Sequence, residues 1–176
     1  MSSGAATGTM ASKITGYSRA QVALHWIVLV LVAFQFLAHD GIEEAWRAFR
    51  RSEPTPAQAA VLTYMHIGAG LLVLMLALAR IYLRMTRGAP APPADEPKLL
   101  QLAAEGVHLL IYALLLSLPL TGAVAWFAGI EASATVHEWL KNVLLAAIAL
   151  HVGGALFQHF VRRSDVLMRM LSPQRE

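Results

Sequence analysis

Four long stretches without a formal charge divide the chain, and they set its architecture. They cover residues 22–38, 59–79, 106–130 and 142–161. A helix that crosses a bilayer needs about 20 mostly apolar residues, and only the first stretch, with 17 residues, falls short of that length. None of the four shows the charged face that a helix of a soluble bundle turns to water. The pattern predicts an all-α integral membrane protein, folded as an up-and-down bundle of four transmembrane helices.

The composition agrees with this prediction and narrows the possible chemistry. Only 14% of the residues are charged, against about 25% in average globular chains. The chain has no cysteine, which excludes disulfides, thiolate-bound iron–sulfur clusters and thioether-attached haem. The first residues are small and polar and lack an apolar core. We therefore expect no cleavable signal peptide, and the first helix to serve as an uncleaved signal.

Positive charges are distributed unequally between the two ends of the predicted bundle. Ten lie in the two tails and the middle loop: Lys13, Arg19, Arg80, Arg84, Arg87, Lys98, Arg162, Arg163, Arg169 and Arg175. The other two loops hold four: Arg47, Arg50, Arg51 and Lys141. Lys and Arg accumulate on the cytoplasmic side of membrane proteins. We therefore predict a multi-pass protein of the bacterial inner membrane, with both termini in the cytoplasm.

The loops and tails complete the predicted layout. The connections 39–56, 88–97 and 129–134 are short, which places consecutive helices antiparallel and adjacent. We expect residues 1–17 to form a flexible cytoplasmic tail, residues 18–163 the transmembrane domain, and residues 164–176 a basic cytoplasmic tail at the membrane interface. The lipid bilayer is the expected surrounding, and no nucleic-acid partner is expected.

Histidines are the candidate functional residues, because six of the seven lie within or at the ends of apolar spans. His39 is the exception, and we expect it to be a solvated loop residue beside Asp40. Ionisable residues inside a membrane are costly and usually face a partner or a cavity. A single buried histidine can instead bridge two helices, but six are more than such bridging requires. The six are His25, His66, His108, His137, His151 and His159.

Four of these histidines fall at two depths. His25 and His151 lie in the inner half of the bundle, whereas His66 and His137 lie in the outer half. The fourteen residues from His137 to His151 correspond to about 21 Å of helix rise and just under four turns. Both rings therefore point to roughly the same side of the last helix, about 40° apart.

Two layers of facing imidazoles are the ligand set that two bis-histidine haems require. Small residues beside these histidines would make room for a planar macrocycle, although glycine also serves close helix packing in membranes. Zinc is a weaker candidate, because it takes three or four clustered ligands and each layer offers only two. The glycines assigned to haem packing are Gly68, Gly70 and Gly153.

Four motifs in order along the chain resemble those of the bacterial cytochrome b561 family. They are YSRAQVALHW (17–26), MHIGAG (65–70), HLLIYALLLSLPLTG (108–122) and HEWLKNVLLAAIALH (137–151), the last followed by QHF at 158–160. The resemblance covers about residues 17–172. It implies a small dihaem protein with two haem b groups. The family's ligand motifs match His25 and His151 for the inner haem, and His66 and His137 for the outer haem.

The resemblance also implies electron transfer to or from quinone, and it is nearest to a branch of superoxide oxidases. Such a protein oxidises superoxide at the outer haem and reduces ubiquinone near the inner one. The segment FAGIEASATVHEW (127–139) is shorter than the outer loop of that branch. The outer loops also carry more acidic than basic residues. These loops therefore have no global positive field. The cluster RAFRR (47–51) can form a local one or can equally be ordinary loop charges at an interface. The candidates for steering superoxide are Arg47, Arg50, Arg51 and Lys141.

Further polar residues near the inner end are candidates for quinone binding. A quinone site needs hydrogen-bond partners and a route for protons, and histidine supplies both. We assign His159, His108 and Arg19 to this role, although His108 can equally bridge helices, and Trp26 to haem packing. Two alternatives remain: an electron-carrier subunit that links a periplasmic redox partner or dehydrogenase to quinone, and a haem-free transporter or proton relay.

Overall fold

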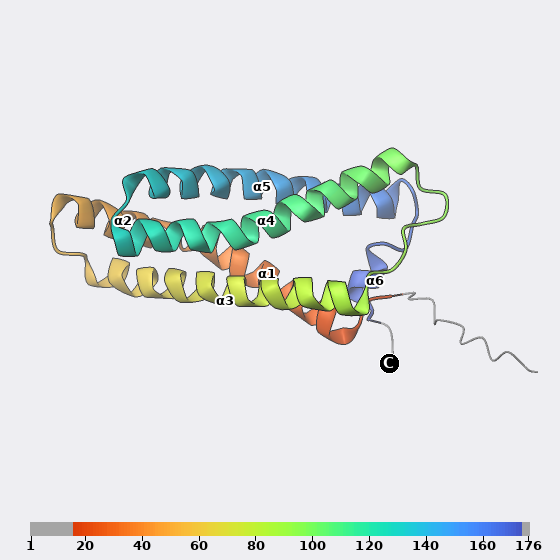
Figure 1. The fold of residues 1–176 in the computed structure, drawn as a ribbon, viewed down its shortest axis with the longest axis horizontal. Coiled ribbons are helices and arrows are strands. Elements are labelled where there is room, and N and C mark those ends of the chain that lie inside the picture. Colours follow the sequence, from red (N-terminus) through yellow and green to blue (C-terminus); the bar gives the residue numbers. More distant parts are fainter. Residues whose placement is uncertain (1–15, 174–176) are drawn as a thin grey trace, which may run out of the picture.

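Helices account for all the regular structure in residues 16–173, the part of the chain that the computed structural model describes. The predicted N-terminal tail, 1–17, lies almost entirely outside these residues. The four long helices lie side by side, and the two short ones lie at opposite ends of the bundle (Figure 1). The helices are α1 (Arg19–Leu37), α2 (His39–Arg51), α3 (Ala57–Arg87), α4 (Lys98–Ala128), α5 (Glu131–Phe160) and α6 (Met168–Leu171).

The four long helices are apolar and long enough to cross a membrane, as predicted. Their common core is small and consists of Val28, Val32, Val73, Ala77, Leu114, Leu115, Leu144 and Ala147. Large apolar side chains such as Val30, Leu109 and Leu150 remain mostly exposed. A soluble monomer rarely exposes contiguous apolar surface on this scale, whereas lipid tails cover it at no cost. The chain is therefore a multi-pass membrane protein.

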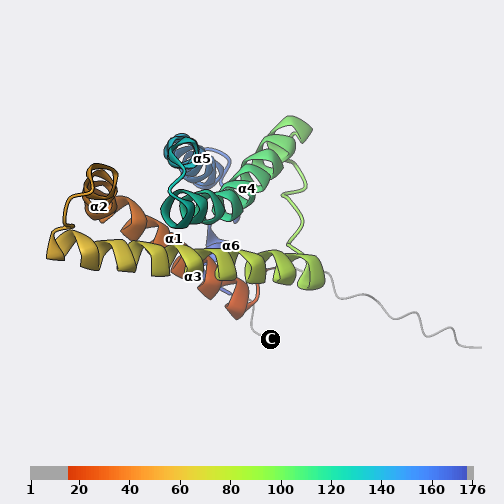
Figure 2. The ribbon, with the colours of Figure 1, turned by 60° about the vertical axis from the view of Figure 1, so that its left-hand side comes forward.

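Packing follows the chain: α1 lies against α3, α3 against α4, and α4 against α5. The start of α1, the connector between α3 and α4, and α6 share one end of the bundle, which we call the inner end (Figure 1). Helix α2 and the connection between α4 and α5 lie at the opposite, outer end. The turned view in Figure 2 shows α4 and α5 together on one side of α3.

The sequence predicts a loop at the outer segment 39–56, but most of this segment is helix α2. Helix α2 buries Gly41, Ala45 and Ala48 and leaves its charged residues outside. These positions recur every three to four residues, so they form one small-residue face. A Cβ atom at residue 41 would collide with the side chain of Leu62. The small face therefore lets α2 lie directly on α3 and close the outer end.

The first transmembrane helix begins at a capping box. The Ser18 hydroxyl accepts from the Gln21 backbone N–H at 3.3 Å, and the Gln21 side-chain carbonyl accepts from the Ser18 N–H at 3.0 Å. These bonds satisfy backbone donors that a helix start leaves free. The Gln21 side-chain amide also donates to the Gly88 carbonyl at 3.0 Å. The start of α1 is thereby joined to the end of α3.

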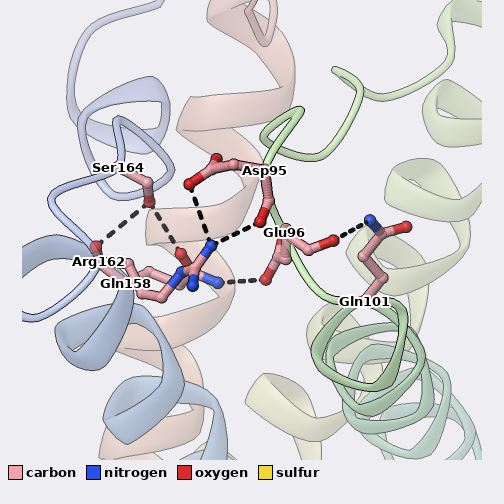
Figure 3. Close-up of polar contacts among 6 residues, drawn as sticks. All are labelled: Asp95, Glu96, Gln101, Gln158, Arg162 and Ser164. Atoms are coloured by element: carbon pink, nitrogen blue, oxygen red, sulfur yellow. Dashed lines mark hydrogen bonds and ion pairs between the residues drawn. The ribbon is translucent and has the colours of Figure 1, made fainter.

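Polar contacts join the connector 88–97 to the end of α5 (Figure 3). The Gln158 side-chain amide donates to the buried carboxylate of Glu96. The Ser164 hydroxyl donates to the Gln158 side-chain oxygen at 3.0 Å. Arg162 bonds both the backbone carbonyl of Asp95, at 2.9 Å, and its carboxylate, at 3.2 Å. We call these five residues the inner latch, since they hold two segments far apart in sequence.

The described part of the C-terminal tail folds back on the inner end. Arg169 donates to the Ala91 carbonyl at 2.7 Å, and the Trp26 indole N–H donates to the Met170 carbonyl at 2.9 Å. Arg169 also pairs with Asp165 at 2.8 Å. The basic side chain of Arg169 in the tail therefore contacts other residues of the same chain. That the tail also lies at a membrane interface stays a prediction.

Candidate functional site

The outer end of the bundle brings together His66 of α3 and His137 of α5. The centres of their rings are 6.4 Å apart. A metal–imidazole bond is about 2 Å long and a ring centre lies roughly 1 Å behind its nitrogen, so two imidazoles on opposite sides of one metal ion have centres roughly 6 Å apart. The separation of this pair therefore fits two imidazoles that would hold one metal ion between them.

The inner half of the bundle holds a second pair, formed by His25 of α1 and His151 of α5. Their ring centres are 6.1 Å apart. The two pairs have nearly equal separations although they use different partner helices. Helix α5 contributes one imidazole to each pair, and the structure brings together the residues that the depth argument pairs.

A backbone carbonyl orients His137 within the outer pair. Its Nδ1 lies 2.9 Å from the Leu118 carbonyl oxygen. A carbonyl only accepts, so Nδ1 carries the proton and Nε2 keeps its lone pair for a metal. The Thr121 hydroxyl also donates to the Leu118 oxygen, at 3.0 Å, and lies 3.3 Å from Nδ1. A hydrogen bond of this kind fixes ring orientation and raises the basicity of a ligating histidine.

A cavity of about 450 Å³ surrounds the outer pair, within the size range of cofactor sites. Its walls are mostly apolar and come from the four long helices and α2. Two buried polar atoms that face no hydrogen-bond partner among residues 16–173 belong to its lining: Nδ1 of His66 and the side-chain oxygen of Gln35. Buried polar atoms are rarely left unpaired. Together with the paired imidazoles, they fit a cofactor that brings both a metal and polar groups.

Two glycines line this cavity, and the sequence analysis identified one of them. A Cβ atom at Gly70 would lie 3.1 Å from the Gln35 side-chain nitrogen, and one at Gly122 would lie 3.0 Å from Cε1 of His137. Gly122 was missed, although it stands in the quoted motif of the third span. A Cβ at Gly68 or Gly153 meets nothing within 4 Å, so these two do not crowd a histidine ring.

A third imidazole joins the inner pair. The ring centre of His108, from α4, is 5.0 Å from that of His151. Its Nδ1 lies 2.6 Å from the Ala104 carbonyl, so Nδ1 is protonated and Nε2 is available to a ligand.

Arg80, which the sequence pattern identified only as a cytoplasmic charge, also lies at this depth. It donates to the Gln21 carbonyl at 3.5 Å, and its guanidinium is 6.0 Å from the centre of the Tyr112 ring.

The remaining inner candidates have different surroundings. His159 packs edge-on against Phe160, with ring centres 4.9 Å apart, and its Nδ1 is buried without a partner in the described chain. Arg19 is exposed in the first turn of α1. Trp26 contacts His25 edge-on at 5.4 Å, and its bond to Met170 also anchors α6. The structure therefore places His108 and Trp26, but not Arg19, beside the inner pair.

The four candidate basic residues at the outer end differ in position. Arg47, Arg50 and Arg51 are exposed on α2 and are absent from the cavity lining, whereas Lys141 is part of it.

The prediction for His39 is wrong, because His39 is not a solvated loop residue. It begins α2, its side chain is only 16% exposed, and its ring centre is 6.3 Å from that of His66. The sequence could not show that a helix follows His39 and folds it inward.

Four apolar spanning helices that carry two pairs of facing imidazoles, one above the other, define a membrane cytochrome of the b type. The chain belongs to the prokaryotic cytochrome b561 family, whose model matches residues 16–173. The family implies haem b as cofactor and electron transfer across the membrane as activity.

Three relatives match nearly the full length of the chain. A protein named cytochrome b562, from Cereibacter sphaeroides, is 34% identical and covers 90% of this chain and 97% of its own. Cytochrome b561 homolog 1 of Escherichia coli is 29% identical, with 91% and 98% covered. A probable superoxide oxidase, CybB, of Yersinia pestis is 28% identical, with 90% and 97% covered.

Proposed function

We propose that this chain binds two haem b groups and carries electrons across the membrane, accepting them from superoxide at the outer face and passing them to ubiquinone at the inner face. His66 and His137 would hold the outer haem, and His25 and His151 the inner one. When bound, the two haems supply one-electron carriers at two depths. The observation that supports the ligand assignment most directly is the similar separation of the ring centres in the two histidine pairs, 6.4 and 6.1 Å.

The protein between the two pairs sets their separation and their surroundings. Helix α5 spans the distance with fourteen residues from His137 to His151, about 21 Å of rise. Leu144 and Ala147, on the same helix between them, are buried in the apolar core. This packing excludes water from the space between the layers, and a low dielectric strengthens the influence of nearby charges.

Superoxide as donor is supported by the position of Lys141. Its side chain is 18% exposed and lines the outer cavity beside the His66–His137 pair. Its ammonium group offsets the neighbouring carboxylates of Glu43 and Glu138, and so lowers the repulsion that a small anion meets at the mouth of the cavity. The naming of the Yersinia pestis relative points to the same substrate.

Ubiquinone as acceptor is supported by His108. Its free Nε2 lies in the inner layer, on a ring 5.0 Å from that of His151. An imidazole in this position accepts a hydrogen bond from a quinol hydroxyl and can hold a proton during reduction. We assign His159 and Arg19 to the approach of the quinone, and we place this end of the bundle at the cytoplasm.

Haem content tests the ligand assignment. Protein purified from membranes should contain two haem b per chain by absorption spectroscopy. His66→Ala and His137→Ala should each remove the same haem and leave the other, and His25→Ala should remove the remaining one. His159→Ala is the matched control and should keep both. Loss of one haem common to the His66 and His25 variants would contradict the pairing.

Coupling of the two half-reactions tests the substrates. Purified protein supplied with enzymatically generated superoxide should reduce ubiquinone, followed by ultraviolet absorption. Lys141→Met should lower kcat/KM for superoxide by on the order of ten-fold, with a weaker dependence on salt. Protein that contains both haems and yet reduces no quinone would contradict superoxide as donor while leaving the electron-carrier role intact.

A further inference from the structure

A group of three metal-binding side chains lies at the mouth of the outer cavity. His39 and Glu43 come from α2, and Glu138 comes from α5. One ligand atom of each lies within 4.8 Å of the other two. The His39 Nε2 atom is 3.3 Å from a Glu43 carboxylate oxygen and 3.5 Å from one of Glu138. We propose that these three residues bind a divalent transition-metal ion, with Zn²⁺ as the best match.

The ammonium group of Lys141 is a cation that already contacts two of these three residues. It lies 2.6 Å from a Glu138 carboxylate oxygen and 2.9 Å from Nε2 of His39. An ammonium only donates, so Nε2 is the acceptor and its lone pair points to the position of the cation. His39 and Glu138 therefore already contact a cation here, and a Glu43 carboxylate oxygen lies within 4.8 Å of a ligand atom of each.

The charges favour a second positive charge at this point. With His39 neutral, these residues and Lys141 contribute two carboxylates and one ammonium, so the group carries one net negative charge. A divalent ion that displaces the ammonium would neutralise both carboxylates. Glu43 and Glu138 have side chains about half exposed, at 49% and 47%, so an ion can enter from the water outside the membrane.

The ligand set selects the class of ion. One imidazole nitrogen and two carboxylate oxygens suit zinc, which takes three protein ligands and a water in open sites. Calcium prefers six to eight oxygens, and magnesium keeps most of its waters in an octahedral shell. Neither preference is met by three ligands of which one is nitrogen.

The site lies where electrons would enter. Glu138 follows His137 in sequence, and His39, Glu43, Glu138 and Lys141 all line the cavity that holds the outer pair. A bound ion would remove Lys141 from its position and narrow the mouth. We therefore infer that Zn²⁺ slows electron entry from the outer face. This consequence rests on the proposed function, whereas binding itself does not.

Zinc titration of the haem-loaded protein tests the proposal. Full-length protein without a polyhistidine tag should bind one Zn²⁺ per chain by isothermal titration calorimetry. His39→Ala, Glu43→Gln and Glu138→Gln should each weaken binding by more than the roughly 10–100-fold that loss of an outer-shell partner costs. Glu131→Gln is the matched control, an exposed carboxylate on the same helix and the same side, and should bind Zn²⁺ as the unaltered chain does.

Substitution of Lys141 provides a second test, because a misfolded variant would not bind Zn²⁺ more tightly. Lys141→Met removes the competing charge and should tighten Zn²⁺ binding about ten-fold or more, with an unchanged haem spectrum. Weaker or unchanged binding in this variant would overturn the proposal, as would a Zn²⁺ site that survives His39→Ala. Tight binding without slower superoxide oxidation would leave the metal site standing and contradict only its effect on electron entry.

Discussion

At the scale of single residues, the outer site depends on neighbours that hold one imidazole in place. The Leu118 carbonyl accepts from His137 Nδ1, and Gly122 lies against the edge of the same ring. Both neighbours come from α4, so the orientation of a candidate ligand on α5 is set by the adjacent helix. A site of this kind tolerates displacements of only about 0.5 Å.

Gly122→Ala should therefore disturb only the proposed outer haem. The added Cβ would lie 3.0 Å from Cε1 and 3.2 Å from Nδ1 of His137, which is too close unless the ring shifts and its bond to Leu118 weakens. We expect a shifted midpoint potential or partial loss of the outer haem, measured by redox titration of the α-band. Gly106→Ala, on the same helix, is the control, because a Cβ there meets nothing within 4 Å. Identical spectra for the two variants would contradict this role of Gly122.

At the scale of elements, the chain connects helices through polar contacts placed outside the apolar spans. The inner latch joins the connector 88–97 to α5, and the Ser18–Gln21 box joins α1 to α3. Such bonds matter because membrane helices have no hydrophobic driving force for association in lipid and rely on packing and on interhelical hydrogen bonds. The latch therefore contributes to keeping α4 and α5 aligned at the inner end.

Gln158→Leu should destabilise the protein through the latch. It leaves the buried Glu96 carboxylate without its amide donor, which costs about 1–3 kcal/mol for an unsatisfied buried group. The melting temperature in detergent, followed by circular dichroism, should fall. Adding Glu96→Leu should recover part of the loss, since neither polar group then remains unpaired. A double variant no more stable than Gln158→Leu would show that Glu96 is not the group left unpaired.

At the scale of the whole molecule, the distribution of charge indicates which end faces the cytoplasm. The inner end, with the connector 88–97 and α6 (Figure 1), carries most of the lysines and arginines. Some of these also act within the protein, as Arg162 and Arg169 do. The bias toward one end nevertheless predicts the orientation.

Single cysteines can report this orientation, because the chain has no cysteine of its own. Thr55 and Ala94 are both exposed, in the connections at opposite ends of the bundle. On intact spheroplasts, a membrane-impermeant maleimide should label Thr55→Cys at once and Ala94→Cys only after permeabilisation. The reverse pattern would invert the topology, and with it the sides assigned to superoxide and quinone.

Hydropathy and spacing alone determined the four spans and the two depths of histidine. Both follow from local rules, since an apolar run of membrane length becomes a helix and each residue adds a fixed rise. The same rules predicted which histidines lie at equal depth, and the structure shows those pairs side by side. The family motifs pointed to the same four residues.

Only the tertiary structure decided which other side chains surround these pairs. It made residues 39–51 a helix that carries His39 inward, and it brought His108 beside His151 and Gly122 against His137. It also showed that Lys141, of the four candidate outer charges, lines the cavity. These contacts depend on how each helix is rotated and how closely its neighbour approaches. Side-chain packing over the whole bundle sets both quantities, and the residue pattern of one helix specifies neither.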